Sequence, residues 1–363
     1  MNKKEIAEIK KQFLIHNCNI TRIIGRIIDD DKETVADMNE RFLNLPEEML
    51  FKFLDMFKDS ISGRIRKNLY SLEFKQDSDA IEFIKALRDS RLSEATAYDT
   101  LLEKIKEQYD TKGRFAIFLI HGVYDIPGKA TDGAEMHDAS DEVYEYIMTC
   151  ICPVHVSAPA LGIEFGENII QTARRQWIIG KPDTAFLYPA FTDRSEDYDH
   201  IWYYTKKANE PAEEIIENVL GCHSPETPEQ QKEAFLKMTC IEKNNTYEME
   251  EAKRIYQDLQ VLSINADLLG EGITRQQLEK VLRIPHTGED EEVVLQNIMD
   301  LKKFNVLMAD ASVSVAADRT DLIEMREIDG EQYICVKAGG TVMANGMEIG
   351  NGKTDKEENS EEN

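Results

Sequence analysis

The sequence lacks most features that would assign a chain to a familiar class. No apolar run reaches the roughly 18 residues that a transmembrane helix needs, and the first residues contain no apolar stretch that would indicate a secretory signal peptide. The 6 cysteines include no Cys-x-x-Cys pair. Cys150 and Cys152 lie two residues apart in an apolar stretch, so in a strand both would point to the same face. We expect them to be reduced core thiols rather than metal ligands. These absences predict a cytoplasmic protein without disulfides.

Positive charge is also in short supply. The 363 residues contain 43 Lys and Arg against 69 Asp and Glu, which gives a net charge of −26. Such a surplus argues against a protein that coats nucleic acid or an anionic membrane with its whole surface. Hydrophobic residues nevertheless make up 42% of the chain, which provides a sizeable core and excludes wholesale disorder.

The spacing of apolar residues predicts an α+β protein. Helical periodicity is present over residues 3–14, 47–58, 80–87, 95–109, 229–237, 247–259, 274–282 and 291–302. Alternating or continuous apolar runs predict strands over residues 20–28, 64–74, 115–120, 144–156, 184–188 and 201–205. Asp329-Gly330 and Asn345-Gly346 are typical of two-residue hairpin turns. Because strands and helices do not alternate regularly, we expect a mainly antiparallel sheet with flanking helices, an inserted helical block and a C-terminal β-hairpin unit.

These elements divide the chain into four expected parts. An N-terminal α+β domain covers residues 1–222, and a helical block covers residues 223–303. A β-hairpin unit over residues 304–349 is expected to pack back on the core. Residues 350–363 contain no apolar side chain, which predicts a disordered acidic tail.

A polar segment, residues 121–142, directly follows the buried strand predicted at residues 115–120. Loops at strand ends commonly carry functional groups, and seven acidic residues against one basic residue give residues 121–146 a net charge of −6. Carboxylates and imidazoles could hold a hard divalent cation, with the metal-ligand candidates Asp132, Glu135, His137, Asp138 and Asp141. Their spacing matches no calcium loop and no phosphate-binding loop, so an ordered loop that satisfies its own backbone is the alternative.

Four further residues are candidates for catalysis. His121 and Asp125 lie at the start of the polar segment, whereas Asp193 and Arg194 belong to a second polar cluster at residues 191–200. In a metal-assisted hydrolase, carboxylates would bind the cation and a histidine would act as general base. The sequence does not decide whether the two polar segments form one site.

Two short segments are basic within this acidic chain. Residues 1–28 contain six basic and two acidic residues, a net charge of +4, and residues 60–75 contain four basic and one acidic residue, a net charge of +3. If the two predicted strands are neighbours, one stripe could contact nucleic acid or another anion through Arg22, Arg26, Arg64, Arg66 and Lys67. The alternative is that these side chains pair with the surplus carboxylates.

Several motifs spread along the chain carry a family resemblance. They lie at residues 1–6, 17–18, 20–23, 45–48, 124–130, 138–147, 152–154, 182–184, 191–195 and 327–330. Together these motifs resemble the domain-of-unknown-function 4317 family of low-GC Gram-positive anaerobic bacteria. The resemblance implies a bacterial cytoplasmic protein and no particular activity, because the family is defined without one.

Three hypotheses about function follow from the sequence. The first is a non-enzymatic binding or scaffold protein, because no catalytic signature occurs in a well-patterned globular chain. The second is a metal-assisted hydrolase that uses residues 121–142, and the third is local association with nucleic acid through the N-terminal basic edge. We expect no cofactor unless the second hypothesis holds and requires a divalent cation. We expect a protein or a small molecule as the partner, and no membrane.

Overall fold

The chain separates into two compact units, Met1–Thr227 and Pro228–Asn363, each with its own buried clusters. The computed structural model describes residues 1–76, 78–111, 113–129, 135–136, 142–164, 169–172, 174–241, 247–269, 272–285 and 292–349. The further division of residues 223–363 into a helical block, a hairpin unit and a tail stays a prediction.

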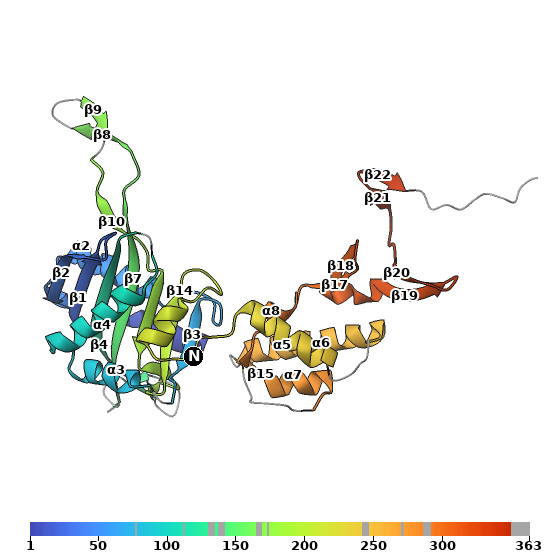
Figure 1. Ribbon diagram of the computed structural model, residues 1–363, viewed down its shortest axis with the longest axis horizontal. Helices are drawn as coiled ribbons and strands as arrows, with labels where there is room; N and C mark the ends of the chain where they lie inside the picture. Colours follow the sequence, from blue (N-terminus) through green and yellow to red (C-terminus); the bar gives the residue numbers. More distant parts are fainter. Residues whose placement is uncertain are drawn as a thin grey trace, which may run out of the picture. The chain divides into compact units, whose positions relative to one another are not determined.

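The first unit is built on one antiparallel sheet in the order β2-β1-β4-β7-β11-β14-β3, with β10 paired to β7 beside this path (Figure 1). The strands are β1 (Ile20–Ile28), β2 (Thr34–Arg41), β3 (Leu69–Glu73), β4 (Phe115–Asp125), β7 (Val143–Val156), β10 (Trp177–Ile179), β11 (Thr184–Tyr188) and β14 (His200–Thr205). Strands β4 and β11 are buried along almost their whole length because helices cover both faces of the sheet.

Helices form a layer on each face of this sheet. Helices α1 (Lys3–Gln12) and α2 (Glu47–Asp59) bury their apolar stripes in one cluster with the first face. Helices α3 (Ala80–Asp89) and α4 (Ala95–Gln108) and the π-helical turn η2 (Ile215–Val219) pack in a second cluster on the other face. Helix α1 begins with a capping box in which Asn2 and Glu5 each accept a backbone N–H, which fixes its start.

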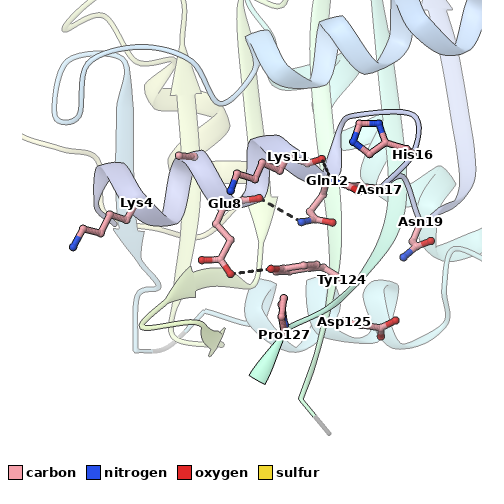
Figure 2. Close-up of a pocket in the computed structure, with 11 residues that line it drawn as sticks. Lys4, Glu8, Lys11, Gln12, His16, Asn17, Asn19, Tyr124, Asp125 and Pro127 are labelled. Carbon is pink, nitrogen blue, oxygen red and sulfur yellow. Dashed lines mark hydrogen bonds between the residues drawn. The ribbon is translucent and has the colours of Figure 1, made fainter. Parts of the chain in front are cut away.

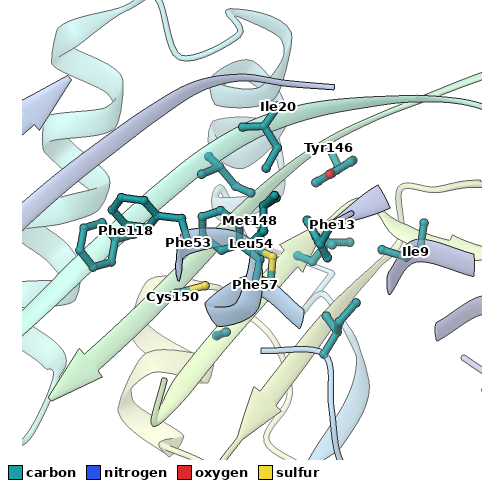
Figure 3. Close-up of a cluster of buried hydrophobic side chains, with 14 of the residues drawn as sticks. Ile9, Phe13, Ile20, Phe53, Leu54, Phe57, Phe118, Tyr146, Met148 and Cys150 are labelled. Carbon is teal, nitrogen blue, oxygen red and sulfur yellow. The ribbon is translucent and has the colours of Figure 1, made fainter. Parts of the chain in front are cut away.

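The first cluster combines aliphatic residues with several aromatic rings that contact one another (Figure 3). Phe53 of α2 meets Phe118 of β4 edge to face with ring centroids 5.1 Å apart. The ring centroid of Phe13, the residue after α1, lies 5.8 Å from that of Phe57. Cys150 and Cys152 are buried and free, and both belong to this cluster, as expected of reduced core thiols.

Short hairpins and turns complete the first unit. They are η1 (Phe42–Asn44), β5 (Gly128–Lys129) with β6 (Glu135–Met136), β8 (Leu161–Glu164) with β9 (Ile169–Thr172), and β12 (Ala190–Thr192) with β13 (Ser195–Asp197). Strands β7 and β10 extend beyond the helix-covered sheet as a two-stranded ribbon, and β8 and β9 lie between them in the chain (Figure 1).

The second unit combines helices with three β-hairpins. Its helices are α5 (Pro228–Ile241), α6 (Met249–Leu269), α7 (Arg275–Leu282) and α8 (Leu295–Ile298), and its short strands β15 (Ile273–Thr274) and β16 (Glu292–Val293) pair. The hairpins are β17 (Lys303–Leu307) with β18 (Ser312–Ala316), β19 (Ile323–Ile328) with β20 (Glu331–Val336), and β21 (Val342–Ala344) with β22 (Met347–Ile349), and η3 (Ala317–Leu322) joins the first two. Tyr256 of α6 packs with Phe304 and Ile323, so the hairpin segment contacts a helix of its own unit.

The predicted α+β class is confirmed, but several predicted elements are wrong. The helix expected over residues 291–302 is reduced to α8, and β16 precedes it. Strand β2 was not predicted because it is a mostly exposed edge strand without apolar alternation. Strand β4 continues through His121 to Asp125, where a loop was expected, because that stretch pairs with β7. The strand expected over residues 64–74 begins only at Leu69, after a turn in which Arg66 has a φ of 63°. Among the described helices, none has the length and apolar character needed to cross a bilayer.

Candidate functional site

His121 is a buried residue of the sheet rather than the first residue of a loop. Its side chain is 0% exposed, and both ring nitrogens have partners: Nε2 lies 2.8 Å from Glu145 Oε1 and Nδ1 lies 2.7 Å from Thr21 Oγ1. A carboxylate only accepts hydrogen bonds, so Nε2 carries the proton and Nδ1 accepts from the threonine hydroxyl. Burial lowers the pKa of His121 below its ordinary value, partly opposed by Glu145, and the imidazole is therefore neutral.

A β-bulge places Thr21 beside the histidine. The register between β1 and β4 shifts between Ile20 and Arg22, and Thr21 is the additional residue. Glu145 extends the network beyond the histidine. Arg91 Nε lies 2.8 Å from its Oε1 atom, and its backbone N–H donates to the Glu196 carboxylate. Each member of this network has a partner, so it ties β1, β4 and β7 to the connection between α3 and α4.

The two polar segments, residues 121–142 and 191–200, contact each other near the start of each segment. Arg194 Nη2 donates to the Pro127 carbonyl at 2.8 Å, and Arg194 Nη1 lies 2.7 Å from Glu8 of α1. Asp193 contributes its backbone N–H, which donates to Glu5 at 3.1 Å, and both turn residues have left-handed φ values. The catalytic candidates Asp193 and Arg194 thus anchor the β12–β13 turn to helix α1.

An open polar pocket of about 490 Å³ lies beside α1 at the end of β4 (Figure 2). Asp125 lines it with Lys4, Lys11, His16 and Tyr124. The Tyr124 hydroxyl donates to Glu8 at 2.8 Å, so the charge of this carboxylate is already shared with Tyr124 and Arg194. The pocket could admit a small polar molecule, but it does not contain His121.

Most of the metal-ligand candidates lie outside the described residues, namely Asp132, His137, Asp138 and Asp141. For Glu135 the structure describes only the backbone, which belongs to β6. Within the described part of the chain, no three His, Cys, Asp or Glu side chains come together as a metal site would require. A cation at residues 121–142 therefore stays a prediction.

The basic residues do not form the single stripe that the sequence suggested. Strand β1 and strand β3 are separated in the sheet by β4, β7, β11 and β14, so Arg22 and Arg26 lie far along the sheet from residues 64–67. Arg26 contacts three carboxylates, those of Asp37, Asp99 and Glu103, at 2.7 to 3.0 Å.

The remaining basic candidates lie in two separate places. Arg22 donates to the Leu92 carbonyl at 3.1 Å, which holds the α3–α4 connection. Arg66 and Lys67 lie in the turn before β3, where the Lys67 carbonyl accepts from Tyr70, and Arg64 is exposed beside them. For Arg26, pairing with surplus carboxylates is the interpretation that holds.

Strand β10, whose apolar side chains are the most exposed among the first-unit strands with fully described side chains, escaped the sequence analysis. In the β7–β10 ribbon, defined as Val154–Val156 with Trp177–Ile179, the side chains of Trp177, Ile178 and Ile179 are 55%, 41% and 40% exposed. Successive side chains of a strand point to opposite faces, so β10 exposes apolar area on both of its faces. One sequence pattern could have revealed this strand: an apolar triplet, residues 177–179, that contains one of the 2 tryptophans and comes shortly after two arginines.

Positive charge surrounds this apolar strand. The Arg114 guanidinium lies 4.1 Å from the centre of the Trp177 ring, and its Nε contacts Asp30 at 3.0 Å. Arg174 and Arg175 lie just before β10, separated from it by Gln176. Both are exposed, and among the described carboxylates none pairs with them. Lys181, just after β10, lies 3.0 Å from Asp59. The ribbon is thus an exposed apolar strand in a basic setting on an acidic protein.

Of two comparisons with known proteins, one identifies a family for the chain. A search of the curated proteins finds no match. The model of the family described as Domain of unknown function (DUF4317) matches residues 1–347. This match covers both units described above, and the chain therefore belongs to the DUF4317 family.

Proposed function

We propose that the protein is a non-enzymatic, cytoplasmic binding or scaffold protein whose contact surface is the β7–β10 ribbon. The observation that carries this proposal is the exposure of Trp177, Ile178 and Ile179 on one strand. Exposed apolar patches on a folded protein commonly mark interaction sites, and tryptophan and arginine are the residues most enriched among energetic hot spots.

The environment of the best catalytic candidate supports binding over catalysis. His121 is enclosed, and both of its nitrogens already have hydrogen-bond partners, so it offers no free lone pair to a substrate. The open pocket beside α1 is lined mainly by polar and charged groups, whereas the ribbon offers apolar area. A protein partner therefore fits the molecule better than a small molecule does.

A crosslinking and binding experiment tests the proposal. A photoreactive residue at position 178 of the full chain should crosslink one partner in the source cells, and the purified partner should then bind the purified protein. Trp177→Ala should weaken this binding by about tenfold or more, because tryptophan hot spots contribute at least about 2 kcal/mol.

Phe51 provides the matched control. It is an aromatic residue of α2 and is 43% exposed, close to the exposure of the residues of β10. Phe51→Ala should leave the affinity within about twofold, which is below 0.5 kcal/mol. A partner that binds wild type and Trp177→Ala equally would overturn the proposal, and greater loss with Phe51→Ala would move the surface to α2.

A further inference from the structure

We infer that the partner presents an extended, acidic segment, which adds as a strand to the free edge of β10. This inference rests on the proposed function and specifies the chemistry of its partner. Three observations support it: the direction of the backbone groups of β10, the side chains on each face of the ribbon, and the charges at both ends of the strand.

The hydrogen-bond pattern leaves alternate backbone groups of β10 free. Ser157 N donates to the Gln176 carbonyl and Gly180 N donates to the Pro153 carbonyl, both at 2.8 Å, and the register between them pairs Ile178 with His155. In an antiparallel pair every second residue faces its neighbour strand, so the N–H and C=O groups of Trp177 and Ile179 point away from β7. Within the described chain no strand pairs with that edge.

The side chains divide between the two faces in the same alternation. Trp177 and Ile179 lie on the face of Val156 and Val154, and Val154 packs against the cluster under α1 and α2. An added strand would therefore continue an existing apolar layer on that face. Backbone bonds to a sheet edge together with contacts to alternate side chains are the two components of recognition by strand addition.

Charge selects an acidic strand over a second copy of this chain. An antiparallel pair of two β10 edges centred on Ile178 would place Arg175 of one copy opposite Lys181 of the other, and like charges in such positions are destabilising. A segment with carboxylates at both ends would instead meet Arg174 and Arg175 at one end and Lys181 at the other.

The overall acidity of the protein does not prevent this recognition. Charges separated by more than about 10 Å are largely screened at ordinary ionic strength, so the arginines beside β10 decide the local field. The segment that fits has alternating apolar residues in its centre and Asp or Glu at its ends.

Synthetic peptides test the inference on the full chain. The probe is Glu-Glu-Val-Thr-Val-Thr-Val-Glu-Glu, with two controls: the same peptide with Lys in place of Glu, and the Glu peptide N-methylated on the valines. Trp177 is exposed and Trp202 is buried, so a blue shift of tryptophan emission on titration reports burial of Trp177. We expect the Glu peptide to bind at least about tenfold more tightly than either control, and less tightly as salt is raised.

Two pairs of variants separate strand addition from general stickiness. Ile179→Pro removes an N–H that faces the open edge and should weaken binding by about tenfold or more, whereas Ile179→Val should bind as wild type does. Arg174→Glu combined with Arg175→Glu should reverse the preference toward the Lys peptide. This charge variant keeps the test valid even if the proline variant does not fold.

The outcomes distinguish this inference from the proposed function. Equal binding of the N-methylated peptide would overturn strand addition, and equal binding of the Lys peptide would overturn the acidic specificity. If no peptide binds but a crosslinked partner depends on Trp177, the inference fails while the proposed function stands. If neither peptides nor any partner depend on Trp177, both fail.

Discussion

Replacing His121 with leucine should destabilise the first unit in a pH-dependent way. Leucine is close to histidine in volume but removes the hydrogen bonds to Thr21 and Glu145, at 2.7 and 2.8 Å. A neutral hydrogen bond contributes about 1 kcal/mol and one to a carboxylate about 1.5–3 kcal/mol. Glu145 keeps its contact with Arg91, so no buried charge is abandoned. We expect a loss of about 2–4 kcal/mol in the free energy of unfolding near pH 8.

The pH dependence follows from the lowered pKa of His121. In the unfolded chain the residue titrates near its ordinary value of about 6.5, but in the folded protein burial keeps it neutral to lower pH. The unfolded state therefore binds more protons as the pH falls through this range, and wild type loses up to about 1.4 kcal/mol per pH unit. The leucine variant lacks this contribution, so the difference between the two proteins should shrink between pH 8 and pH 5.

The assay is urea unfolding followed by tryptophan fluorescence. Both tryptophans, Trp177 and Trp202, lie in the first unit, so the emission reports on this unit. A difference between wild type and His121→Leu that stays constant or grows on acidification would refute the argument. A constant difference would mean that folding leaves the pKa of His121 unchanged, and a growing difference would mean that Glu145 stabilises a charged imidazole in the folded protein.

Further expectations concern other parts of the first unit and one exposed thiol. Cys150 should resist a thiol reagent until the protein unfolds, because burial raises its pKa to about 12, whereas the partly exposed Cys335 should react in the native state. Gly122→Ala should lower the free energy of unfolding in urea by about 1–3 kcal/mol, because a Cβ there would lie 2.5 Å from the Tyr146 ring. Gly113→Ala is the control: a Cβ there would have no atom within 4 Å, and the loss should be under about 1 kcal/mol. Arg26→Met should lower the stability by about 1–3 kcal/mol at low salt, because it leaves three carboxylates without this partner, and it should leave any DNA binding unchanged. Weaker DNA binding would support the nucleic-acid hypothesis instead.

Apolar periodicity predicted the elements whose burial is regular along the chain. The continuous run that begins at Phe115 indicated a central strand, and it lies at the centre of the sheet between β1 and β7. The Asp329-Gly330 turn was equally predictable, because both residues need positive φ and have values of 55° and 83°. Elements that lack a buried face carry no such pattern, and β2 was missed for this reason.

The site was harder to predict because its contacts join distant parts of the chain. Thr21 and His121 are 100 residues apart, and only the bulge in β1 brings the hydroxyl to the ring. From the sequence, His121 was a candidate general base at the start of a polar loop. In the structure its strand pairs with β7, and the side chain is a buried member of a hydrogen-bond network. The edge of β10 was hidden in a different way: a short apolar triplet shows nothing of which backbone groups have partners.

The most direct test of the ribbon as a binding surface is residue-resolved amide hydrogen exchange of the full chain, with and without the crosslinked partner. The amide of Ile178 faces β7 and should exchange slowly in both states, whereas those of Trp177 and Ile179 face the open edge and should become protected only when the partner is bound. Protection that appears elsewhere while Trp177 and Ile179 exchange as in the free protein would contradict the proposal.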